Sequence, residues 1–197
     1  MSSTVKTLLY GLTDAGQGIE AAMLPLDGFV VEVGDGEPPC VAHELAERIA
    51  RALPPLTARW ARLARGSRLP AGYSGACTPP EADRPTGAAV HVACIDQDGL
   101  DPETIPADVD AVWLRPRSSG SSSATRFDFA LVQKLSHLHR VILEVPDGAA
   151  GVEVAIRLGR PYAVLFADAV WFRPGIVDLD LLEQSLAVVQ RLNKRSL

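Results

Sequence analysis

Short apolar runs alternate along the chain with amphipathic stretches, which is the pattern of repeated strand–helix units. The clearest helix covers residues 41–53, where apolar residues recur at a spacing of four from Val41 to Leu53 and Pro54 follows. The run 27–33 is apolar on both faces apart from Glu32, as expected of a parallel strand that is covered on both sides. Strands are predicted at 7–10, 27–33, 57–63, 89–95, 111–114, 141–145 and 162–166, and helices at 14–23, 41–53, 127–138, 152–158 and 179–193.

The periodicity fails between residues 64 and 87, because eight glycine and proline residues fall within that stretch. Loop structure is predicted there, with one short strand near Tyr73. The acidic segment 96–108 has little helical pattern, and the serine-rich segment 118–123 is predicted to be a loop. The strand–helix units are therefore regular toward both ends of the chain and eroded in its centre.

Composition and charge exclude several classes of protein. The chain has 197 residues, 47% of them hydrophobic and 22% charged, which fits one globular domain over residues 1–197. The formal net charge of -5 argues against a nucleic-acid partner, which would require a basic face. No apolar run is long enough for a membrane span or a secretion signal, so we expect a cytoplasmic protein without a membrane partner.

The three cysteines are odd in number and widely spaced, and no CxxC pair occurs. This spacing favours reduced, mostly buried thiols over a zinc site or a disulfide framework. We therefore expect no metal and no cofactor. The cysteines are Cys40, Cys77 and Cys94.

Several segments, taken in order, resemble motifs of one enzyme family. Residues 9–13, Leu-Tyr-Gly-Leu-Thr, are similar to a strand-one motif K-I-C-G-(L/I)-T, and 27–30 to D-A-x-G-F-V-F of strand two. Residues 110–114, a small-residue loop and 126–129 resemble D-A-x-L-L-D, a glycine-rich loop and K-T-F-D-W. Further on, residues 141–156, 160–164 and 167–178 are similar to F-I-L-A-G-G-L-N-P-E-N-V-A-E-A-I, R-P-Y-G-V-D and S-S-G-V-E-S-S-P-G-V-K-D. The chain thus resembles the phosphoribosylanthranilate isomerase family.

The resemblance implies an α/β fold, a (β/α)8 TIM-type barrel with its site at the carboxyl ends of the strands. The stretch 64–87 is short for full strand–helix units, so we expect the barrel to be incomplete or distorted in its central units. The family catalyses an Amadori rearrangement, with a strand-one cysteine as general base and a strand-six aspartate as general acid.

The two catalytic positions of the family carry other residues here. The cysteine position is Tyr10, and the aspartate position is Arg115. A tyrosine is a poor base near neutral pH, and an arginine keeps its proton and cannot serve as an acid. The sequence therefore predicts that both proton-transfer roles are lost.

The family's binding positions are also altered. It holds the substrate phosphate on two glycine-rich turns, which read 144–146 and 167–169 here. Pro146 has no N–H to donate, and Asp168 would repel a phosphate by roughly 1 to 4 kcal/mol for charges about 4 Å apart. The strand-two arginine of the family, which meets the anthranilate carboxylate, is Pro39.

The charged residues at the strand ends define two open interpretations. They form either a new site for a cationic or amine-bearing ligand, or solvated rim charges in which Arg115 pairs with Glu144 or Asp168. Arginines around the serine-rich loop could hold an anion, or that loop is simply solvated. Candidate catalytic residues are Tyr10, Arg115, Glu144 and Asp168, and candidate ligand-binding residues are Glu32, Asp96, Arg117 and Arg126.

Histidines and tryptophans are assigned packing roles. His91 lies in an apolar strand and is expected to be packed, while His137 and His139 are expected to meet the terminal carbonyls of a helix. Trp113 and Trp171 are interpreted as core rather than as ligand platforms.

Three functions remain open. The first is an isomerase-inactive binding or assembly module, supported by Trp171 and Phe172 as residues that would fill the exit of the last strand. The second is an enzyme of changed specificity that uses the rim carboxylates on a small non-phosphorylated ligand, and the third is a true phosphoribosylanthranilate isomerase of tryptophan biosynthesis. An open barrel mouth favours the second and a filled mouth the first. The sequence identifies neither a ligand nor a protein partner and leaves a homodimer open.

Overall fold

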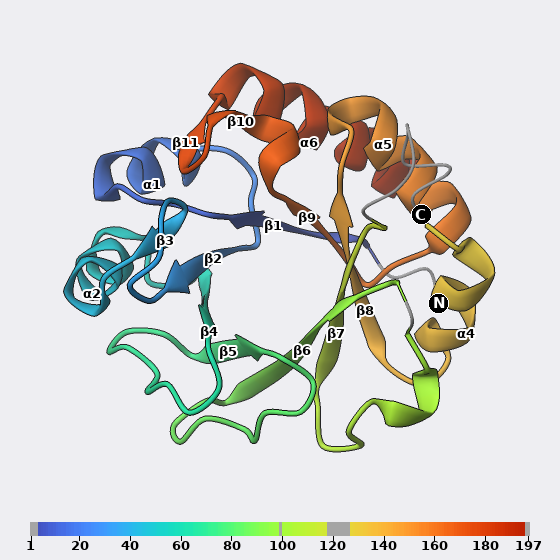
Figure 1. Cartoon of the computed structure of the whole chain (residues 1–197). Helices are drawn as coiled ribbons and strands as arrows, with labels where there is room; N and C mark the ends of the chain where they lie inside the picture. The colour runs from blue at the N-terminus through green and yellow to red at the C-terminus, as the bar shows by residue number, and fades with distance from the viewer. Residues whose placement is uncertain (1–3, 99, 118–126, 196–197) are drawn as a thin grey trace.

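Eight parallel strands close into a barrel in the computed structural model, which describes residues 4–98, 100–117 and 127–195. The first strand pairs with the second on one side and with the last on the other, and these two pairings close the sheet (Figure 1). Every neighbouring pair is parallel, so all carboxyl ends lie at one end of the barrel. The strands are β1 (Lys6–Tyr10), β2 (Gly28–Val33), β4 (Ala58–Leu63), β5 (Gly75–Thr78), β6 (Val90–Asp96), β7 (Ala111–Arg115), β8 (Arg140–Val145) and β9 (Ala163–Phe166).

The helices cover only part of the barrel. Asp14 caps the first helix through the Gln17 N–H, and Asp128 caps a later one through two backbone N–H groups, as its position near the predicted helix start suggests. In Figure 1 the helices lie along the left, upper and right sides of the barrel. They are α1 (Ala15–Ala21), α2 (His43–Ala52), α4 (Phe129–Ser136), α5 (Gly148–Val154), which continues as a π-helical turn over 155–159, and α6 (Leu179–Arg195).

The central irregularity predicted from the sequence lies in the outer layer. Between β4 and β7, the described residues contain no α-helix, and Pro102–Thr104 forms one 3-10 turn (Figure 1, lower side). Loop side chains pack on the outer faces of these strands instead. The sheet itself is complete, because β5 fills the position for which the sequence predicted a short strand near Tyr73. Loop residues of the main apolar core include Leu69, Tyr73, Ala88, Leu100, Ile105 and Val109.

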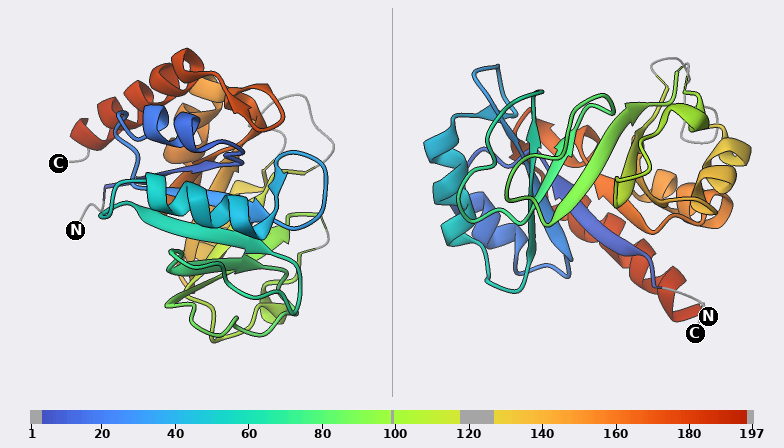
Figure 2. Two further views of the ribbon diagram at one scale, coloured as in Figure 1. Left: turned by 90° about the vertical axis from the view of Figure 1, so that its left-hand side faces the viewer. Right: turned by 90° about the horizontal axis from the view of Figure 1, so that it is seen from below.

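Two short elements were not predicted. Cys40–Val41 forms β3 against the end of β2, so α2 begins at His43 rather than at residue 41. After β9, β10 (Trp171–Arg173) and β11 (Ile176–Val177) form an antiparallel hairpin ahead of α6. Both elements sit at the carboxyl end of the barrel. At the opposite end, the start of β1 and the end of α6 lie side by side (Figure 2), and the Val5 N–H donates to Oδ1 of Asn193 at 2.9 Å.

Alternating side chains along each strand separate an outer core from an inner one. Outward residues pack against helices and loops, and inward residues fill the barrel around Trp113, whose side chain is 1% exposed. Small inward residues at the amino ends of the strands make room for Trp60. The inner core consists of Leu8, Tyr10, Val30, Cys77, Val92, Ala111, Trp113, Ile142, Ala163, Leu165 and Ala167, with Trp60, Val90, Cys94 and Trp171 packed against it.

No helix of the described chain is both long and apolar enough to cross a membrane.

We expect Gly75→Ala to lower the free energy of unfolding by about 1 to 3 kcal/mol, because a β-carbon there would lie 2.8 Å from the indole nitrogen of Trp60 inside a packed barrel. Urea denaturation measures the change. Gly36→Ala is the matched control, since its β-carbon would meet Cys40 at 3.4 Å, and its stability should stay within about 0.5 kcal/mol. Equal stability of the two variants would contradict this packing.

Candidate functional site

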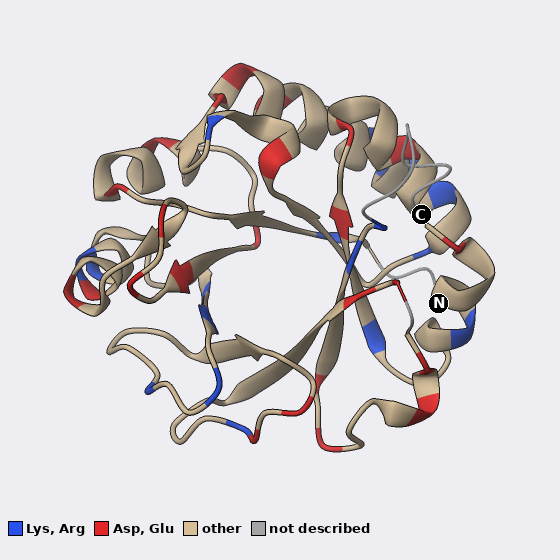
Figure 3. Ribbon diagram, in the orientation of Figure 1, with Lys and Arg blue, Asp and Glu red and all other residues tan. Residues whose placement is uncertain are grey.

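Four charged side chains from four strands meet at the carboxyl end of the barrel. Glu32 on β2 lies in register with Arg62 on β4, and Asp96 on β6 lies in register with Arg115 on β7. Each is on the inward-facing alternation of its strand, two or four residues beyond a member of the inner core. The parallel register thus places opposite charges next to each other in two pairs, and Figure 3 shows acidic and basic positions at the strand ends around the opening.

The first pair forms a three-residue cluster with Tyr10. The Tyr10 hydroxyl donates a hydrogen bond to Oε2 of Glu32. Nη1 of Arg62 donates to the Tyr10 hydroxyl oxygen at 3.0 Å and to Oε2 of Glu32 at 3.2 Å. The guanidinium carbon lies 5.9 Å from the centre of the Tyr10 ring and 5.7 Å from that of Trp113, within the range of cation–π contact. These contacts fix Arg62 in the barrel mouth.

The second pair is extended by a carboxylate deeper in the barrel. Nη1 of Arg115 lies 3.2 Å from Asp96, and its Nε lies 3.8 Å from Oε2 of Glu144. The indole N–H of Trp113 donates to the same Glu144 oxygen at 3.0 Å. Burial raises the pKa of Glu144 from 4.5 to about 6, although the positive charge of Arg115 opposes the shift. Arg115 therefore bridges an exposed and a buried carboxylate.

A cavity of about 620 Å³ opens at this end of the barrel. Its volume is in the range of small-molecule sites. Both arginines and both of their partner carboxylates line it, together with loops that follow β2, β4 and β5. The charged and thiol groups in its wall are Glu32, Asp35, Cys40, Arg62, Cys94, Asp96 and Arg115.

The other side of the mouth is filled. Trp171 stacks on Tyr10 with ring centres 5.9 Å apart and planes inclined by 27°, and its indole N–H donates to the Tyr10 carbonyl oxygen at 3.3 Å. The expectation that Trp171 packs as core at the exit of the last strand agrees with this contact. The same expectation for Phe172 is wrong, because its side chain is 78% exposed. The two residues point to opposite faces of β10, and only Trp171 faces the barrel.

Two thiols, Cys94 in the cavity wall and Cys77 in the inner core, are held protonated. Burial raises the pKa of the Cys94 thiol to about 12 and that of the fully buried Cys77 well above its usual value. A nucleophilic cysteine needs the opposite shift, so neither thiol is suited to attack a ligand. Among the described residues, no group of three or more His, Cys, Asp or Glu side chains is arranged to hold a metal ion.

Only some of the candidate site residues predicted from the sequence line the cavity. Glu32, Asp96 and Arg115 line the cavity, whereas Tyr10 and Glu144 lie in the layer beneath and touch its charged wall. Asp168 is exposed in the turn after β9, on the filled side of the mouth.

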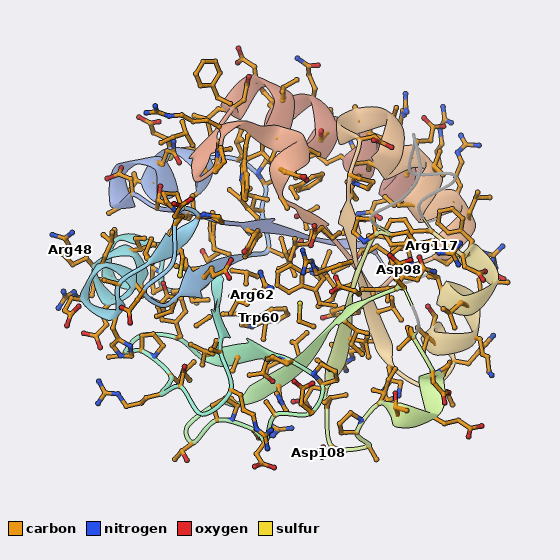
Figure 4. The ribbon with its side chains drawn as sticks, in the orientation of Figure 1. Arg48, Trp60, Arg62, Asp98, Asp108 and Arg117 are labelled. Atoms are coloured by element: carbon orange, nitrogen blue, oxygen red, sulfur yellow. The ribbon has the colours of Figure 1, made fainter. Side chains whose placement is uncertain are left out.

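Arg117, which precedes the serine-rich loop, does not line this cavity. Arg117 lies 3.9 Å from both Asp98 and Asp128, and Figure 4 shows Arg117 and Asp98 together, well away from Arg62. Arg126 and the loop 118–123 fall outside the described residues.

Arg62 is the functional residue that the sequence reasoning missed. The sequence analysis predicts the strand 57–63 but assigns neither Arg62 nor Arg59 to the mouth. Figure 4 shows Arg62 and Trp60 pointing from β4 into the barrel, while Arg59 reaches outward and donates to the Ala50 carbonyl oxygen at 2.8 Å. The alternation of Trp60, Ala61 and Arg62 is the sequence signal that would have identified Arg62. If Ala61 packs in the outer core, its neighbours on both sides must face the barrel interior.

The histidines take two different roles. His91 is packed as expected, 2% exposed, with Nε2 lying 2.9 Å from the Thr78 hydroxyl. His137 and His139, however, make no ring hydrogen bond to the terminal carbonyls of α4 within the described chain. They line a separate cavity at the amino end of the barrel.

No protein-family model matches the sequence of this chain, and no curated protein does either. Solved structures do match. The phosphoribosylanthranilate isomerase from Thermus thermophilus superposes with a TM-score of 0.79 at 22% identity, covering 95% of this chain and 100% of the other. The fold is that of the phosphoribosylanthranilate isomerases. This confirms the resemblance seen in the sequence and the TIM-type barrel it implied.

Two further isomerase structures give the same result. The enzyme from Thermotoga maritima has a TM-score of 0.76 at 16% identity, with 95% of this chain and 99% of the other covered. An isomerase in complex with reduced 1-(o-carboxyphenylamino)-1-deoxyribulose 5-phosphate has a TM-score of 0.73 at 15% identity, with the same coverage. The isomerase fold thus extends over nearly the whole chain.

The buried carboxyl of Glu144 should make stability depend on pH. Because its folded pKa is raised from 4.5 to about 6, the native state holds this proton more tightly than the unfolded chain. The resulting stabilisation is complete below about pH 4.5 and is lost as the pH rises through about 6, a loss of about 2 kcal/mol.

Glu144→Gln lacks this titration but keeps an acceptor for Trp113. The unfolding free energy of the variant minus that of the wild type should therefore rise by about 2 kcal/mol between pH 4 and pH 7 in urea titrations. A difference that is constant with pH would contradict the assignment.

Proposed function

We propose that the chain is a small-molecule-binding barrel of the phosphoribosylanthranilate isomerase fold that does not catalyse the isomerase reaction. The observation that carries this proposal is the open cavity at the barrel mouth, whose wall holds two arginines, each paired with a carboxylate. In the sequence analysis an open mouth favours an enzyme of changed specificity, which likewise needs a small-molecule site, over a binding or assembly module. A surface module for assembly has less support, since the mouth is filled only on the side of Trp171.

The two catalytic positions argue against isomerisation. Arg115 stands where the resemblance implies the general acid, and it is held between Asp96 and Glu144 as a permanent cation. Tyr10 stands where the resemblance implies the base, and its hydroxyl already donates to Glu32 and accepts from Arg62. Tyr10 also lies beneath the cavity rather than in its lining, so its hydroxyl is not placed to accept a proton from a ligand there.

The two turns implied to hold phosphate are equally unsuited to it. Pro146 removes a backbone donor after β8, and the exposed carboxylate of Asp168 follows β9. Trp171 further fills this side of the mouth. A phosphate placed there would meet a negative charge and an apolar ring, so the ligand is expected to carry no phosphate.

The charges of the cavity favour a ligand that carries both a positive and a negative group, such as an amine and a carboxylate. A purely anionic ligand would leave the carboxylates of Glu32 and Asp96 facing it, and a purely cationic one would face Arg62 and Arg115. A ligand of both signs can exchange partners with the two ion pairs and leave no buried charge unpaired.

An enzyme of changed specificity is the second candidate, and Glu144 is the observation that favours it. A carboxyl whose pKa is near 6 can both accept and donate a proton close to neutral pH. It lies beneath the cavity, 3.8 Å from Nε of Arg115, so a ligand would reach it only if that arginine moved aside. Ligand binding is therefore the function we propose for the cavity, and catalysis by Glu144 is the second candidate.

Ligand binding can be tested by thermal shift with a panel of free amino acids, simple amines and simple carboxylates. A ligand at about ten times its Kd stabilises the native state by about 1.4 kcal/mol, which raises the Tm by about 3 to 6 °C. We expect amino acids to give such a shift in the wild type and Arg62→Met to abolish it. Arg48→Met is the matched control, because Arg48 projects from α2 into solvent (Figure 4), and it should leave the shift intact. A panel without any shift, or an equal loss in both variants, would refute the site.

The isomerase alternative has its own measurement. The purified chain is expected to show no turnover of phosphoribosylanthranilate above background, and its gene should not restore growth of a tryptophan auxotroph that lacks this step. The isomerase from Thermus thermophilus serves as the positive control. Turnover that is lost in Arg115→Ala would establish the third function and overturn the proposal.

A further inference from the structure

The amino end of the barrel carries a second cavity, of about 470 Å³, on the face opposite the mouth. Three segments that are distant in the sequence build it. They are residues 109–110 before β7, residues 136–141 at the end of α4 and the start of β8, and residues 160–162 before β9. Four of its side chains are basic or can become so: His137, His139, Arg140 and Arg160.

The two arginines of this cavity have no ionic partner. Neither Arg140 nor Arg160 forms an ion pair with any residue in the part of the chain that the structure describes, and the printed contact of Arg140 is with the Tyr162 ring, 5.4 Å from its centre. Asp110, the acid in the wall, is already engaged: its Oδ2 accepts from Arg84 at 2.9 Å and from the backbone N–H of His91 at 2.8 Å. Within the described part of the chain, the cavity therefore presents two guanidinium groups that no carboxylate neutralises.

The backbone of Arg160 is held in an unfavourable conformation. Its φ of 48° and ψ of 50° are left-handed, a region in which glycine is the favoured residue at the end of a helix. Arg160 is the one described non-glycine residue with positive φ. Local strain of this kind accumulates at functional sites, where the side chain is needed at that place.

From this geometry we infer that the amino-terminal face holds an anion-binding site for a small phosphorylated molecule with a flat apolar portion. Arg140 and Arg160, which both line the cavity, supply guanidinium donors of the kind that suits a phosphate dianion. Tyr162, which is 38% exposed, and Leu138, which is 65% exposed, give the flat portion an apolar contact beside them. This site is separate from the mouth and does not depend on the function proposed for it.

The direct test is calorimetric titration of the wild type with phenyl phosphate, inorganic phosphate and phenol at pH 7 and fixed ionic strength. We expect phenyl phosphate to bind, inorganic phosphate to bind more weakly and phenol not to bind. AMP should behave like phenyl phosphate and ribose 5-phosphate like inorganic phosphate, which separates the contribution of the flat group from that of the phosphate. Absence of binding by phenyl phosphate at millimolar concentrations would overturn the inference.

Two variants test whether the named arginines form the site. Arg140→Gln is expected to weaken phenyl phosphate binding at least about tenfold, since it removes a charge-assisted hydrogen bond. Arg160→Gly should weaken binding to a similar degree while its Tm stays the same or rises, because glycine relieves the left-handed conformation. A structural arginine would instead lose stability on this change.

Matched controls separate this site from general attraction and from the mouth. Arg157→Gln removes an exposed arginine from the π-helical turn that ends just before Arg160, and this arginine is paired with Glu153 at 2.7 Å. Arg115→Gln alters the mouth. Both should bind phenyl phosphate like the wild type. Loss of affinity in Arg157→Gln equal to that in Arg140→Gln would mean nonspecific charge attraction, and loss in Arg115→Gln would move the ligand to the mouth; either result overturns the inference.

Discussion

The hydrogen-bond register of the closed parallel sheet decides which side chains of this protein meet. Each strand contributes every second residue to the barrel interior, and the pairing of neighbouring strands fixes their height along the axis. Glu32 and Arg62 are partners in one register, and Asp96 and Arg115 in another. Two ion pairs at the mouth are thus a direct result of strand pairing, and a shift of one residue in either strand would turn a charge into the outer apolar core.

The same register places an arginine at or beside each of the two positions to which the isomerase resemblance assigns proton transfer. Arg115 occupies a position from which it reaches both Asp96 and Glu144, and Arg62 reaches both Tyr10 and Glu32. Each arginine therefore forms an ion pair or a hydrogen bond with the neighbouring groups that are capable of proton transfer. The result is a polar cavity whose wall carries charges of both signs, with the carboxyl of Glu144 beneath it, and this arrangement is the basis of the proposed ligand of mixed charge.

Much of this architecture could be read from the sequence, and the failures have physical reasons. The strands and the helices near both chain ends were predicted because their apolar patterns are long and regular. β5 was placed two residues early, since Gly75 and its neighbours have little apolar periodicity and gain their strand conformation from pairing with β4 and β6. The hairpin β10–β11 was not predicted because two adjacent aromatic residues, Trp171 and Phe172, give no alternating apolar–polar pattern. In the structure their side chains nevertheless alternate between core and solvent.

The candidate site was predicted in part. Glu32, Asp96 and Arg115 were found because each ends an apolar run, and a charge at that point must face the rim of a parallel barrel. Arg62 was overlooked since a second arginine, Arg59, lies on the same short strand, and only the observed burial of Ala61 shows which of the two faces inward. The second cavity could not be foreseen, because it joins segments that the sequence separates by a helix and a strand.

The sector of the barrel without helices has a consequence for the motions of the molecule. Over β4, β5 and β6 the described outer layer consists of loops and one 3-10 turn, so fewer backbone amides there are protected by helical hydrogen bonds. Partial opening in folded proteins starts where few buried contacts cover the backbone. Deuterium should therefore enter this sector before it enters β1, β8 and β9, which α5 and α6 cover. The wall of the mouth that carries Arg62 therefore belongs to the sector of the barrel in which we expect partial opening to begin.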